Sequence, residues 1–106
     1  MYTHRVNKFY IMSRHLFDLI LFIKRHYLYF LNGIDESVSD FYIFYSDKVV
    51  DPLNPRDLGF LMKMFGVRLL HRRVGNRIQR WYQISYDSLN ASFSNISMLI
   101  HTEISI

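Results

Sequence analysis

The segment from Asn54 to Ile84 reads NPRDLGFLMKMFGVRLLHRRVGNRIQRWYQI and contains the signals for a helix followed by a β-hairpin. Asn54 is a good N-cap, and Pro55 suits the first helical turn, where its missing N–H costs nothing. Four apolar residues then repeat at helical spacing and predict the face that packs on the core: Leu58, Leu61, Met62 and Phe65. Gly66 predicts the end of this helix.

Two strands are predicted after Gly66. The stretches 67–73 and 77–85 are rich in branched and aromatic residues, which favour strands. Val74-Gly75-Asn76 lies between them and indicates a tight turn, because Gly and Asn tolerate positive φ. Trp81 and Tyr82 are adjacent, so their side chains point to opposite faces. We expect one to pack on the helices and the other to stack on a base or a neighbouring arginine.

Two more helices are predicted before Asn54. Ser37 and Asp40 fit a capping box that starts a helix ending near Lys48. Its predicted core stripe is Val38, Phe41, Tyr42 and Tyr45. Ser13 can cap an earlier helix that ends near Leu31, before Asn32-Gly33. The apolar positions that share helical spacing in that segment are Leu16, Leu19, Ile20, Ile23, Tyr27 and Phe30.

The resulting order is three helices followed by a hairpin. This order is the winged-helix plan, an α+β variant of the helix-turn-helix in which the third helix and the wing face nucleic acid. We expect residues 1–12 to form a loose lead-in and residues 13–85 to form the winged-helix domain. Residues 86–106 are Ser/Asn-rich and are expected to form a variable tail with one short helix or strand.

The composition excludes several classes of protein. The chain has 106 residues, half of them hydrophobic, which is enough for one small domain. It has no cysteine, which excludes a disulfide scaffold and a thiolate nucleophile and favours an intracellular location. The histidines lack metal-ligand spacing and no catalytic set is visible, so we expect no metal, no cofactor and no enzyme.

The apolar run 16–31 also needs a membrane test. A membrane-spanning helix needs about 20 uninterrupted apolar residues, whereas this run contains Asp18 and Lys24-Arg25-His26. Each charge at the centre of a bilayer costs roughly 2.5 to 3.5 kcal/mol. We therefore interpret the run as a buried helix and predict no membrane partner.

Positive charge is concentrated in the second half of the chain. The formal net charge is +4, but Asp51–Tyr82 alone carries seven basic and two acidic residues. Val67–Tyr82 contains five arginines and no acid. The arginine fork can bridge phosphate oxygens or the O6 and N7 atoms of guanine. Two alternatives remain: a solvated edge that prevents aggregation, and a protein or acidic-lipid partner.

These features predict double-stranded DNA as the partner. Arg72, Arg73 and Arg77 at the wing tip are expected to supply the main base and phosphate contacts. The other candidates are expected to contact and position the DNA backbone. The full set of predicted DNA-binding residues is Arg56, Lys63, Arg68, His71, Arg72, Arg73, Asn76, Arg77 and Arg80.

Residues 36–84 resemble the second half of the RFX-type winged-helix DNA-binding domain. That family has a Pro-Leu/Val-Asn segment before the third helix and an Arg-Arg-x-Gly-x-Arg wing before a Tyr-rich strand. Pro52-Leu53-Asn54, the wing 72–77 and Trp81-Tyr82 occupy those places. The resemblance implies a transcription regulator, active in the nucleus, whose wing enters the major groove.

The same region also resembles the C-terminal winged-helix domain of poxvirus primase-helicases. The matching residues are Tyr45, Pro52-Leu53, Leu58-Gly59, Met62, Gly66 and Tyr82-Gln83-Ile84. This resemblance implies a replication accessory domain, at a viral replication site, that holds DNA with little sequence preference. A third hypothesis is a protein-interaction module, which forms a homodimer or binds another protein and uses Ile104-Ser105-Ile106 as an oligomerisation strand.

Overall fold

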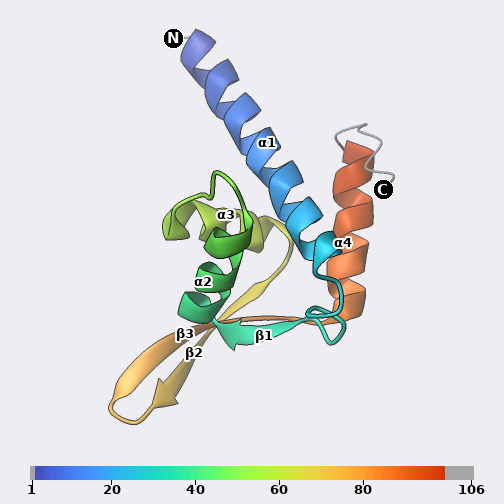
Figure 1. The fold of residues 1–106 in the computed structure, drawn as a ribbon. Helices are drawn as coiled ribbons and strands as arrows, with labels where there is room; N and C mark the ends of the chain where they lie inside the picture. Colours follow the sequence, from blue (N-terminus) through green and yellow to red (C-terminus); the bar gives the residue numbers. More distant parts are fainter. Residues whose placement is uncertain (1, 100–106) are drawn as a thin grey trace.

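The chain forms the three predicted helices and the predicted hairpin, together with a strand after the first helix and a helix after the hairpin. The computed structural model describes residues 2–99 and shows an α+β fold. Its elements are α1 (Tyr2–Arg25), β1 (Ile34–Ser37), α2 (Val38–Lys48), α3 (Pro55–Met64), β2 (Arg68–Val74), β3 (Arg77–Ile84) and α4 (Tyr86–Leu99). The strands form an antiparallel sheet in the order β1-β3-β2. In Figure 1 the sheet lies below the helices, and the β2–β3 hairpin projects beyond them.

The local signals for α2, α3 and the hairpin are confirmed. Ser37 Oγ accepts a hydrogen bond from the Asp40 amide at 3.1 Å, and Asn54 Oδ1 accepts one from the Asp57 amide at 2.8 Å. Both side chains satisfy amides that the first helical turn leaves unpaired. In the hairpin, Val74 pairs with Arg77 across a two-residue turn, in which Gly75 has a φ of 62°.

The first helix differs from its prediction at both ends. α1 begins at Tyr2, within the segment expected to be a loose lead-in, and ends at Arg25 instead of near Leu31. Residues 26–32 form turns instead of a helix. Leaving the helix allows Phe30 to be buried and lets the Tyr29 ring stack on Phe44, with 4.5 Å between centroids. The predicted core position of Tyr27 is therefore wrong, and its side chain is 56% exposed.

Two elements were not predicted as such. β1 pairs with β3, with Ile34 opposite Ile84, although IDES has no strand pattern of its own. α4 occupies much of the expected tail, and Ser85 Oγ accepts a hydrogen bond from the Ser88 amide at its start. Leu89 is buried on this helix. The predicted strand at Ile104–Ile106 lies outside the described residues.

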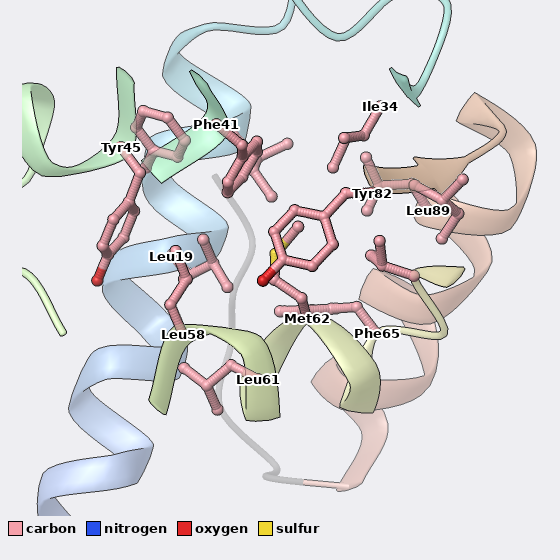
Figure 2. Close-up of a cluster of buried hydrophobic side chains, with 14 of the residues drawn as sticks. Leu19, Ile34, Phe41, Tyr45, Leu58, Leu61, Met62, Phe65, Tyr82 and Leu89 are labelled. Atoms are coloured by element: carbon pink, nitrogen blue, oxygen red, sulfur yellow. The ribbon is translucent and has the colours of Figure 1, made fainter. Parts of the chain in front are cut away.

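The core lies between the helices and one face of the sheet. The predicted α3 stripe of Leu58, Leu61, Met62 and Phe65 is fully buried, as are Phe41 and Tyr45 of α2. Tyr82 of β3 extends into this cluster, and its ring meets the Phe41 ring edge-on at 5.6 Å (Figure 2). Tyr82 is thus the aromatic residue of the Trp81-Tyr82 pair that packs on the helices. Because Tyr82 packs against both α2 and α3, it fixes the position of β3 relative to these helices.

No helix in the range 2–99 is long and apolar enough to cross a membrane. Within the same range, no group of His, Asp and Glu side chains is arranged to hold a metal ion.

Candidate nucleic-acid interface

The face of α3 that points away from the core carries a stripe of three residues, with the 53% exposed Met64 beside it. Successive helical residues are rotated by about 100°, so Arg56, Phe60 and Lys63 at i, i+4 and i+7 lie on one side. The buried residues Leu58 and Met62 lie on the other. All three side chains of the outward stripe are exposed. α3 therefore presents two cations with an aromatic ring between them.

A groove of about 790 Å³ lies between α3 and the base of the hairpin. Its apolar lining comes from the start of α2, from Pro55 and Gly59 on one side of α3, and from residues 67, 69 and 82, and its cations are Arg56, Lys63 and Arg80. The lining residues are Val38, Asn54, Pro55, Arg56, Gly59, Lys63, Val67, Leu69, Arg80 and Tyr82. Because none of them is acidic, the field in the groove is positive and favours an anionic ligand.

Glycine at position 59 brings α3 close to β3. A Cβ placed on Gly59 would lie 3.4 Å from the Tyr82 hydroxyl oxygen. The Tyr82 hydroxyl therefore lies close beneath α3. Burial raises the pKa of Tyr82, while the nearby Arg80 charge acts in the opposite direction. The tyrosine stays neutral at physiological pH, and the positive charge of the groove is not offset by a phenolate.

The register of the hairpin determines which predicted residues join the groove. Residues opposite each other in an antiparallel pair share a face, and successive residues alternate. Leu69 is opposite Tyr82, His71 is opposite Arg80, and Arg73 is opposite Ile78. His71, Arg73 and Arg80 therefore share the face of the sheet that carries Tyr82. Together with Arg56 and Lys63 they form what we call the groove face.

The other face of the hairpin, here called the reverse face, carries Arg68, Arg72 and Arg77, together with Trp81. Asn76 lies in the turn between the strands. The predicted trio of Arg72, Arg73 and Arg77 is thus divided between two faces. Successive strand residues point to opposite faces, so Arg73 lies on the groove face while Arg72 and Arg77 lie on the reverse face. Of the nine predicted residues, five share the groove face and three share the reverse face.

Arg72 is held by two other side chains. Its guanidinium lies 3.4 Å from Asp35 Oδ1 of β1, and its Cζ lies 4.6 Å from the centroid of the Trp81 ring. The Trp81 indole N–H also donates a hydrogen bond to Asp35 Oδ1. The expectation that one aromatic residue of β3 stacks on an arginine is confirmed. Asp35 could not be identified from the sequence, since its strand was not predicted.

The ion pairs among the described residues leave the groove face free. Asp35 pairs with Arg72, and Asp18 and Asp51 pair with Arg14. In the part of the chain that the structure covers, Arg56, Lys63, Arg73 and Arg80 have no acidic partner within 4 Å. Their charges are therefore available to an external anion.

Glu36 is the acidic residue of β1 on the same face as Tyr82, but it does not line the groove. Its carboxylate accepts a hydrogen bond from the Tyr29 hydroxyl at 2.7 Å. Burial raises the pKa of Glu36, and the hydrogen bond from Tyr29 opposes that shift. The same bond is the main cause that raises the pKa of Tyr29 to about 12. This pair fixes the 26–32 turns against β1, outside the lining of the groove.

The cluster of Asp35, Arg72 and Trp81 makes a testable prediction, because Trp81 is the single tryptophan of the chain. Replacing Arg72 by alanine is expected to uncover one face of the indole and to increase quenching of its fluorescence by acrylamide. The stability loss should be under about 1 kcal/mol, as for other exposed ion pairs and cation–π contacts. Arg77→Ala, on the same face but outside the cluster, is the control. Equal quenching in both variants would contradict the stacked arrangement.

A scan against protein-family models and searches of curated proteins and of solved structures find no match to this chain.

Proposed function

We propose that this protein is a winged-helix domain that binds duplex DNA through its groove face. The observation that carries the proposal is that three predicted cations line one groove, and that His71 and Arg73 extend from it along the same face of the sheet. No described acidic residue pairs with the lysine and arginines of this groove face. On this proposal α3 enters the major groove, as the recognition helix of a helix-turn-helix does, and the hairpin contacts the adjacent backbone. Arg72 remains bound to Asp35 and contributes less than the groove-face cations.

The three helices and the hairpin support the winged-helix part of the proposal, although β1 and α4 depart from the simple order of three helices followed by a hairpin. α1, α2 and α3 are followed by the β2–β3 hairpin, and the hairpin projects on the side of α3 that carries the groove. β1 and α4 are additions to the plan expected from the sequence. A protruding hairpin with cations on both faces is suited to reach phosphates outside the footprint of α3. The protein would act on DNA inside the cell, as a regulator of transcription in the nucleus or as a DNA-holding replication domain.

Exposed apolar side chains favour one alternative, a protein-interaction module. The turns after α1 expose Tyr27, Leu28, Tyr29 and Leu31, each by about half or more. Four exposed apolar side chains within five residues, here called the 27–31 patch, are suited to contact another protein. This patch is carried by a different segment from the groove face, so a protein partner and DNA could bind at the same time.

The proposal predicts steeply salt-dependent binding to DNA. We expect the full chain to bind a pool of random-sequence duplexes, measured by fluorescence anisotropy, with a log–log salt slope of roughly −3 to −5. This slope corresponds to about four to six neutralised phosphates. One round of selection and sequencing then separates a sequence-reading regulator, which enriches a motif, from a sequence-tolerant replication domain, which does not. No binding at low salt would overturn the proposal and direct attention to the patch at 27–31.

A further inference from the structure

We propose that Phe60 contacts the 5-methyl groups of thymine in the major groove, an inference that rests on the proposed DNA-binding function. Phe60 is 60% exposed on the outward side of α3, lies between Arg56 and Lys63 along the helix axis, and has the 53% exposed Met64 beside it. If α3 enters the groove on this face, Phe60 is the aromatic side chain that it brings to the base edges. Its chemistry then determines which bases α3 favours.

The spacing of the two cations agrees with this placement. Arg56 and Lys63 are seven residues apart, which corresponds to about 10 Å along the helix axis. The major groove is about 12 Å wide, so two long cationic side chains at this separation can reach phosphates on its two sides. Phe60 then lies between the two cations along the helix axis and enters the groove from the same side of α3.

The remaining side chains of α3 supply little hydrogen-bond readout. The helix reads PRDLGFLMKM and contains no Asn, Gln, Ser or Thr, the residues that recognise adenine by paired hydrogen bonds or that bond to several bases. Base edges in the major groove are polar except at the thymine methyl group. An aromatic ring brought there gains most by covering that methyl group, and the expected outcome is a preference for thymine.

Replacing thymine with uracil tests this inference because it removes the methyl group and keeps the base pairing. We expect the full chain to bind an A/T-rich duplex more tightly than the same duplex with uracil at every thymine. The difference should be about fourfold for each methyl group contacted, the gain from burying one methyl-sized group. A G/C-rich duplex should gain affinity when its cytosines carry a 5-methyl group.

The variants separate this inference from the proposed function. Phe60→Ala is expected to bring the thymine-to-uracil affinity ratio close to one while the salt slope stays unchanged. Ile43→Ala removes a similarly exposed apolar residue from α2 and should keep the ratio. Equal affinity of the unchanged protein for both duplexes, or a ratio that persists in Phe60→Ala, would overturn the role of Phe60 alone. Failure to bind any duplex would overturn the proposed function itself.

Discussion

Replacing Gly33 by alanine is expected to destabilise the protein by at least about 3 kcal/mol. Gly33 has a φ of 84°, which an L side chain rarely adopts, and it is buried where the 26–32 turns meet β1. A Cβ at this position would overlap the carbonyl oxygen of Ile84 and would lie 2.9 Å from the Tyr86 amide nitrogen. Both atoms belong to the backbone, so no side-chain movement relieves the overlap, and β1 must separate from β3.

Urea denaturation of the Gly33→Ala variant measures this effect, and Gly75→Ala provides a matched control. Gly75 also has a positive φ, of 62°, but a Cβ there meets no atom within 4 Å. Alanine at the hairpin turn therefore carries only the conformational strain, about 1 to 2 kcal/mol. The two variants should differ clearly in their urea midpoints. Similar midpoints would mean that the close approach of Gly33 to Ile84 does not exist in solution.

Removing two cations from the groove face is expected to weaken duplex binding at least tenfold. In the Lys63→Ala/Arg80→Ala variant, both substituted residues line the groove from opposite walls, one on α3 and one on β3. If each contacts one phosphate, the salt slope should also become shallower by about 2. Both side chains are exposed, so the folded structure should persist, which circular dichroism would verify.

The matched control removes the same charge from the reverse face. Arg68→Ala/Arg77→Ala lowers the net charge by the same amount, and its residues share the sheet face opposite the groove. We expect this variant to lose less than threefold in affinity, since only the long-range attraction changes. The opposite ranking would support a hairpin that enters the DNA groove by its tip, as the RFX-type resemblance implies, and would remove α3 from the interface.

Local signals in the sequence were sufficient for α2, α3 and the hairpin. Ser37, Asn54 and Gly66 act on backbone groups within a few residues of themselves, so their meaning does not depend on the rest of the fold. The groove cations could also be identified as candidates, because the cluster of arginines is visible in the chain. The division of the predicted hairpin cations between two faces follows from alternation once the pairing register of Leu69 with Tyr82 is known.

The elements that were missed depend on distant partners. Asp35 and Glu36 are poor strand residues, and β1 forms because β3 offers unpaired backbone groups to Ile34–Ser37. α4 contains many Ser and Asn residues of low helix propensity, and it is held partly by Ser92, whose hydroxyl donates to the Phe65 carbonyl at 2.6 Å. A cap at Ser85 and the spacing of Leu89 and Phe93 were the available signals for α4.

The sequence by itself thus determined the elements whose start, stop and inward face are encoded within one or two turns of chain, together with the location of the positive charge. Only the tertiary structure decided where α1 ends, that Asp35 holds Arg72 against Trp81, and which of the predicted cations line the groove. The physical reason is that caps and periodicity act over local backbone hydrogen bonds. Strand pairing, aromatic packing and the sharing of a face by side chains are contacts between residues far apart in the chain.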